Sequence, residues 1–109
     1  MGDVTVVTFK NPKIIDYNQI LLIGRQLNTL VEEGGVRRLL LNFAVVERLS
    51  TAVVGRVIEM HRRMQAVGGE VALCGITPRL REIFDLLRLP QLLPIHDDEQ
   101  HALQKMQPI

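Results

Sequence analysis

The stretch RRLLLNFAVVERLSTAVVGRVIEMHRRMQAVGG, residues 37–69, decides the fold of this chain. A nearly continuous apolar strand ending at Phe43 leads through a short polar step into a helix from Ala52 to Ala66, which stops at two glycines. Two hydroxyls, Ser50 and Thr51, stand where that helix begins. Backbone N–H groups at a helix start lack intrahelical partners, and the helix dipole is positive there. A hydroxyl at this position can therefore cap the helix, and a phosphate on it would be tolerated.

Strands and helices alternate along the rest of the chain. β-Branched residues predict a first strand over 4–9, and Asp16 with Gln19 has the capping-box spacing that begins a helix over 17–33. Strands are also expected over 36–43 and 70–74, an extended segment over 92–95, and helices from Thr77-Pro78 to about 87 and over 98–106. This alternation predicts an α/β fold: a small sandwich with a mainly parallel central sheet and helices packed on it.

Composition sets the broad class of protein. With 109 residues, 47% of them hydrophobic, we expect one domain over 1–109. The 13 basic and 12 acidic residues form no block of like charge, which argues against nucleic acid as a partner. No apolar run approaches the roughly 20 residues that span a bilayer. No membrane association is therefore expected. The single Cys74 lies in an apolar run and is expected to be an inert buried thiol, which favours a cytoplasmic location.

Residues 36–106 resemble the STAS domain, the module shared by bacterial anti-sigma factor antagonists and the cytoplasmic tails of sulphate transporters. The resemblance lies in the order of short motifs: LLLNF at 39–43, LSTAVVG at 49–55, GGEV at 68–71, LCGITP at 73–78, FDLLRL at 84–89 and LLPIHDDEQHAL at 92–103. It implies the same α/β sandwich. The segment before Val36 is shorter and less typical of the family, so the early part of the sheet is expected to be reduced.

In the antagonists of this family, the segment between the strand and the helix has a sequence similar to Asp-Ser-Ser/Thr-Gly-Leu-Gly. The hydroxyl after the aspartate is phosphorylated there by an anti-sigma factor that is itself a protein kinase. Aligned on Gly55, the resemblance makes Thr51 the phosphoacceptor, with Ser50 the less favoured choice if the register shifts by one. This chain has Ser50, Ala52 and Val53 in place of the aspartate, the next hydroxyl and the first glycine. These departures weaken the switch more than the fold.

The residues alone leave Thr51 two roles, as a phosphoacceptor or as the N-cap of its helix, and they leave Ser50 open as a polar loop residue or as the cap itself. Val53 and Val46 are expected to be exposed near the helix start, either as part of a docking patch or as a loosely covered edge of the core. The predicted partner-binding residues are Arg48, Ser50, Thr51, Val53, Val54 and Arg56. The group His96, Asp97, Asp98 and His101 does not have the spacing of a metal site, and no metal or catalytic residue is predicted.

The first functional hypothesis is a non-enzymatic regulator similar to an anti-sigma factor antagonist. It would bind a kinase-type anti-sigma factor, be phosphorylated at Thr51, and need no cofactor because the kinase supplies the ATP. The alternative is a stressosome-like scaffold, in which the domain associates with itself or with other STAS proteins and Thr51 only caps the helix. Ser50 and Val53, which replace the family residues, favour this alternative. A third and weaker hypothesis is a sensor that binds a small ligand near the helix start.

Overall fold

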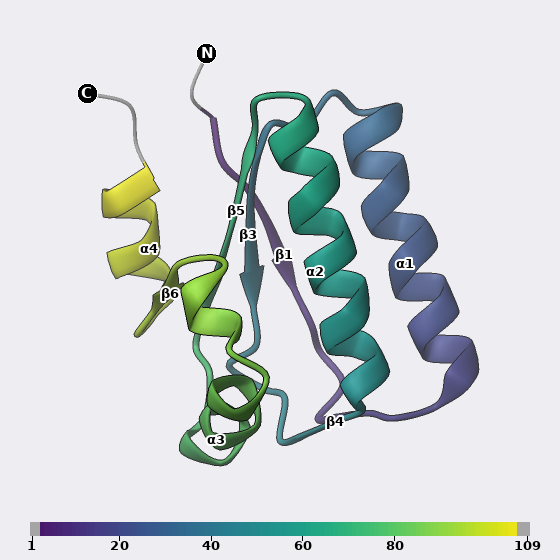
Figure 1. Ribbon diagram of the computed structural model, residues 1–109, viewed down its shortest axis with the longest axis vertical. Coiled ribbons are helices and arrows are strands. Elements are labelled where there is room, and N and C mark those ends of the chain that lie inside the picture. The colour runs from purple at the N-terminus through teal and green to yellow at the C-terminus, as the bar shows by residue number, and fades with distance from the viewer. Residues whose placement is uncertain (1–2, 107–109) are drawn as a thin grey trace.

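The computed structural model describes residues 3–106 as alternating strands and helices (Figure 1). The strands are β1 (Thr5–Thr8), β2 (Lys13–Ile14), β3 (Arg38–Asn42), β4 (Arg48–Leu49), β5 (Glu70–Cys74) and β6 (Ile95–His96). The helices are α1 (Tyr17–Glu32), α2 (Thr51–Ala66), α3 (Pro78–Leu86), the 3-10 turn η1 (Leu89–Gln91) and α4 (Glu99–Met106). Most predicted elements are therefore present, with ends that differ by one or two residues.

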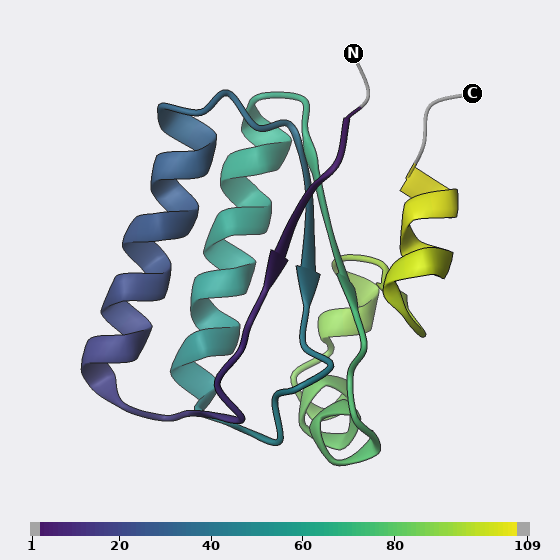
Figure 2. The same ribbon diagram turned by 180° about the vertical axis from the view of Figure 1, so that it is seen from behind.

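The main sheet has the strand order β1-β3-β5-β6, and all its neighbours are parallel. Helices α1 and α2 cover one face and α4 covers the other (Figures 1 and 2). The central strand β3 is buried on both faces because its side chains alternate. Leu39 and Leu41 join the larger apolar cluster with α1 and α2, whereas Leu40 packs with Ala102 and Met106 of α4. The predicted α/β sandwich with a mainly parallel sheet is confirmed.

Three phenylalanines tie the larger cluster together at the carboxyl ends of the strands. The ring of Phe43 lies 4.8 Å from that of Phe9 and 6.0 Å from that of Phe84, the second pair edge to face. Phe84 belongs to α3, so this contact fixes the third helix on the same core as the sheet. Edge-to-face and tilted ring pairs of this kind add to the stabilisation from buried area.

Local capping signals are confirmed for two helices. Asp16 caps α1 by accepting from the N–H of Gln19, and the Gln19 side chain accepts from the Asp16 N–H, which completes the capping box. Thr77 caps α3, with Pro78 at the first helical turn. In both cases the residues that determine the helix start are within three positions of one another, so sequence spacing suffices to find them.

Strands β2 and β4 form a separate parallel ribbon that the sequence pattern did not predict. Lys13 is in register with Arg48, and Ile14 with Leu49. The Pro12 carbonyl accepts from the N–H groups of Glu47 and Arg48, at 2.8 and 3.0 Å. This ribbon joins the segment before α1 to the segment before α2, and it places the start of α2 at the carboxyl ends of the main strands (Figure 1).

Within residues 3–106, each helix falls short of the length and apolar character needed to cross a membrane.

Candidate functional site at the start of helix α2

Ser50, and not Thr51, caps α2. Ser50 has extended backbone angles (φ −74°, ψ 144°), and its hydroxyl oxygen accepts from the Ala52 N–H at 3.2 Å. Thr51 is the first residue of the helix, and its side chain is exposed. Within the described residues its hydroxyl makes no hydrogen bond. The prediction that Thr51 caps the helix is therefore wrong, and the cap and the candidate phosphoacceptor are two different residues.

Val53, Val54 and Val46 are buried, which corrects the predicted partner surface. Val53 is 0% exposed, and Val54 and Val46 are also core residues. With α2 beginning at Thr51, positions 53, 54 and 57 fall on the stripe that faces the sheet. Val46 is held inward where its N–H donates to the Phe43 carbonyl at 2.9 Å. None of the three valines can contact a partner while the protein is folded.

The exposed apolar side chains at this end of the molecule come from other segments. Ile15 and Tyr17 are exposed, Tyr17 to 70%, and so is Val45 in the loop between β3 and β4. The Ser50 N–H donates to the Ile14 carbonyl at 3.0 Å, which places Ile15 beside the start of α2. Sequence reasoning missed this residue. The signal was present, since two adjacent isoleucines in an extended segment cannot both face the core.

Two cationic side chains extend the same surface. Lys13 and Arg48 lie side by side in the β2–β4 ribbon, both exposed, and neither forms an ion pair with a residue in 3–106. Alternation along β4 puts Arg48 and Ser50 on the outer face and Leu49 in the core. We call Lys13, Ile15, Tyr17, Val45, Arg48 and Thr51 the α2-start surface. It combines exposed apolar and cationic side chains from the segments that meet where α2 begins.

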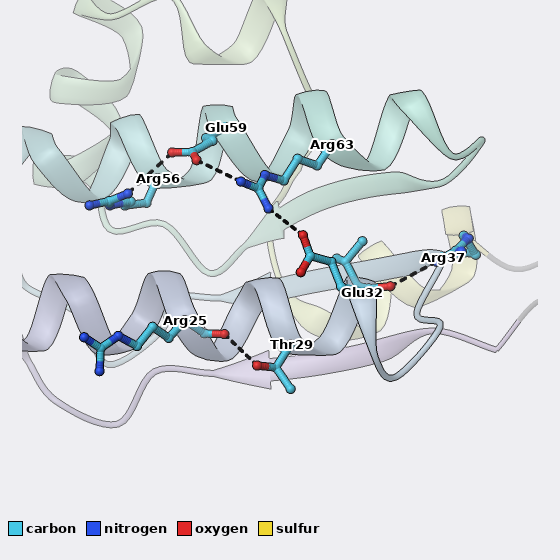
Figure 3. A network of polar contacts seen from close by, with 8 residues as sticks. Arg25, Thr29, Glu32, Arg37, Arg56, Glu59 and Arg63 are labelled. Carbon is cyan, nitrogen blue, oxygen red and sulfur yellow. Dashed lines mark hydrogen bonds and ion pairs between the residues drawn. The ribbon is translucent and has the colours of Figure 1, made fainter.

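Arg56, also predicted to bind a partner, belongs to a different face. Its guanidinium pairs with Glu59 at 3.5 Å, and Glu59 in turn pairs with Arg63, which reaches Glu32 of α1 at 2.9 Å (Figure 3). This chain of charges bridges α1 and α2 on their outer side. Arg63 thereby connects the two helices. Arg56 therefore belongs to this charged face of α2 and not to the α2-start surface.

The other reactive groups have structural roles. Burial, together with the nearby negative charges of Glu99 and Asp98, raises the pKa of the Cys74 thiol to about 11, so it remains protonated and unreactive at neutral pH. Asp98 accepts from the His101 N–H at 2.8 Å, and this bond holds the pKa of the carboxyl below its usual range. Within residues 3–106, His, Cys, Asp and Glu side chains form no group of three or more suited to a metal ion.

A family model described as the STAS domain matches residues 1–102 of the chain. The protein belongs to the STAS domain family. The anti-sigma F factor antagonist of Paenibacillus polymyxa is 19% identical to this STAS protein over 93 residues, which cover 85% of this chain and 80% of the relative. These findings confirm the resemblance to anti-sigma factor antagonists.

Solved structures show the same fold. An anti-sigma factor antagonist (STAS) domain protein from Planctomyces limnophilus superposes with a TM-score of 0.82 at 20% identity, over 97% of this chain and 92% of that one. The Bacillus cell fate determinant SpoIIAA in its phosphorylated form gives a TM-score of 0.74 at 21% identity, over 96% and 92% of the two chains. At such low sequence identity, the likeness shows that this STAS protein shares the fold of these structures and shows no more than that.

Proposed function

We propose that this STAS protein is an anti-sigma factor antagonist that binds a kinase-type anti-sigma factor through its α2-start surface, and that phosphorylation of Thr51 weakens this binding. The exposed Thr51 hydroxyl, next to a cap already supplied by Ser50, is the observation that carries the proposal. Modifying Thr51 leaves the hydrogen bond of the cap in place. Phosphorylation can therefore change the surface without unfolding the start of the helix.

The position of Thr51 also suits a phosphate electrostatically. A phosphothreonine carries about −1.5 to −2 charges at neutral pH. At the first residue of a 16-residue helix, the unpaired N–H groups and the dipole favour an anion, and Lys13 and Arg48 lie on the adjoining ribbon. The modified protein is therefore expected to remain folded, while the phosphate largely cancels the two positive charges that Lys13 and Arg48 give the α2-start surface.

A partner shaped for the unmodified surface would lose affinity on phosphorylation. Such a partner would offer acidic groups to Lys13 and Arg48 and apolar groups to Ile15, Tyr17 and Val45, all of which are exposed. A phosphate among these contacts repels acidic groups and costs desolvation. A loss of about 1.4 kcal/mol would weaken binding tenfold. The proposal gives the chain no enzymatic step and no cofactor of its own.

The scaffold alternative loses one of its two supports. Val53 was expected to add bulk on the partner surface, but it is buried beneath the helix. The other argument for a scaffold is that Ser50 replaces the acidic residue. Ser50 is the N-cap of α2, so a serine at this position is also explained by helix capping. A scaffold would associate with itself without any kinase, so the two functions predict different sedimentation behaviour for the purified protein.

The test is phosphorylation with site mapping. The purified protein is incubated with ATP and each kinase-type anti-sigma factor encoded in the same genome, and its intact mass is measured. We expect one added phosphate on Thr51, none in Thr51→Val, and undiminished phosphorylation of Ser50→Ala, which lacks only the cap. Phosphate on Ser50, or on neither hydroxyl with every kinase tried, would overturn the proposed switch.

Binding gives the second half of the test. Thr51→Asp is expected to weaken binding to the anti-sigma factor at least tenfold while leaving the circular dichroism spectrum unchanged. Thr51→Val, which has similar bulk and no charge, is the matched control and is expected to bind like the wild type. Equal binding by both folded variants would contradict the proposed mechanism.

A further inference from the structure

Strand β1 has an open edge. It lies at the end of the four-stranded sheet and, within residues 3–106, pairs only with β3 (Figure 2). The Phe9 N–H donates to the Asn42 carbonyl at 3.1 Å, toward β3. Because backbone groups alternate along a strand, Thr5 and Val7 also point toward β3, whereas the N–H and C=O groups of Val6 and Thr8 point outward. Outward groups of this kind are a template for pairing with another extended chain.

A groove of about 740 Å³ lies directly beside this edge, between β1 and α1. Its apolar wall comprises Phe9, Leu22, Ile23, Leu27 and Leu30. Leu22 is 53% exposed, although it is one of the larger apolar residues of α1. The volume is within the range of about 300 to 1,000 Å³ that is typical of binding pockets. The groove could therefore receive side chains from a strand that pairs with β1.

The charged side chains that line the groove are both cationic. Lys10, just after β1, and Arg25 of α1 both line it, and none of the aspartates or glutamates in residues 3–106 does. Neither cation has an ion-pair partner among the described residues. Figure 3 shows the Arg25 side chain extending from α1, while the Arg25 backbone carbonyl accepts from the Thr29 hydroxyl. The charge of the groove thus complements an acidic ligand.

We propose that the edge of β1 and this groove bind an extended peptide segment of a partner protein, apolar at alternate positions and acidic at its flanks. The segment adds a strand to the sheet by bonding to the outward backbone groups of Val6 and Thr8. Its apolar side chains enter the groove on one face, and its acidic flanks lie near Lys10 and Arg25. Strand addition of this type takes affinity from the main chain and specificity from alternate side chains. This site is separate from the α2-start surface and does not depend on the proposed function.

The first test uses a synthetic probe, the capped peptide Glu-Val-Thr-Val-Thr-Val-Glu, with NMR detection of amide hydrogen exchange. We expect saturable binding, with exchange slowed at least tenfold at Val6 and Thr8 and much less at Thr5 and Val7, which already point toward β3. A peptide with proline at the central valine lacks the necessary N–H and should not bind. A peptide with lysine flanks should bind more weakly.

Matched variants test the groove and its charge. Leu22→Glu places a carboxylate in the groove and should weaken binding of the acidic peptide at least tenfold. Leu86→Glu, at an 83% exposed leucine of α3, is the same change elsewhere and should have no effect. Arg25→Gln should weaken binding about two- to fivefold, as expected for a surface ion pair. Arg62→Gln, at an exposed arginine of α2, is its control.

Three results would overturn the proposal. Binding without slowed exchange at Val6 and Thr8, with shifts confined to methyl groups of Leu22 and Leu30, would identify a small apolar ligand instead. Slowed exchange at Val6 and Thr8 that grows with protein concentration and needs no peptide would identify a second copy of the chain as the occupant. No binding of any probe peptide at millimolar concentration would exclude strand addition. None of these results bears on phosphorylation of Thr51.

Discussion

Replacing Ser50 by alanine should destabilise the protein, whereas the same change at Thr51 should not. Within residues 3–106, the Ser50 hydroxyl is the only side-chain acceptor for the N–H groups of the first turn of α2, through its 3.2 Å bond from the Ala52 N–H. Loss of a serine cap costs about 0.5 to 2 kcal/mol. Because this bond is long and partly open to solvent, we expect about 1 kcal/mol, or a fall of about 4 °C in the melting temperature.

The assay is urea unfolding followed by far-UV circular dichroism, with Thr51→Ala as the matched control. Thr51 makes no hydrogen bond within residues 3–106, and alanine is the better helix former, so the free energy of unfolding should change by less than about 0.5 kcal/mol. Two results would refute the division of roles between the hydroxyls. One is that Thr51→Ala lowers the free energy of unfolding by about 1 kcal/mol, and the other is that Ser50→Ala leaves it unchanged.

Two further predictions concern buried residues. Val53→Gly, which restores the glycine typical of the family, should lower the free energy of unfolding by about 3 kcal/mol, measured by urea unfolding. About 2 kcal/mol of this comes from lost apolar burial and about 1 kcal/mol from placing glycine inside a helix. A loss of only about 1 kcal/mol would show that Val53 is exposed. Burial raises the pKa of Cys74 from its ordinary 9.0 to about 11, so the unfolded chain releases this proton first and stability should fall as the pH rises from about 9 to about 11. At pH 8 the native thiol should react with a disulfide reagent about a hundredfold more slowly than the thiol of the unfolded chain, because it has that much less thiolate.

Helices and strands that are determined by residues close together in the sequence were predicted well. The strand before Phe43 is continuous in apolar residues because β3 is covered on both faces. The box of Asp16 and Gln19, and the cap at Thr77, need only neighbours within three residues. In each case the interaction that stabilises the element is local, so the pattern and the structure agree.

The candidate site was predicted less well because its geometry depends on contacts between distant segments. The two residues of β4 are extended only because they pair with Lys13 and Ile14, some 35 positions earlier, and this pairing sets where α2 begins. With α2 beginning at Thr51, Ser50 is the cap and Thr51 is exposed, while the packing of α2 against the core buries Val53. The start of a helix does not change which of its residues share a face, so the burial of Val53 depends on how widely the rest of the protein covers α2, which a local pattern does not show.

The sequence by itself determined the family, the alternation of strands and helices, and the two hydroxyls at the start of α2. These depend on periodicity and on short motifs, which each segment carries on its own. Only the tertiary structure decided which hydroxyl is free, which apolar side chains surround it, and that β1 has an open edge beside a groove. Exposure is a property of how segments pack together, because a side chain is buried only when another part of the chain covers it.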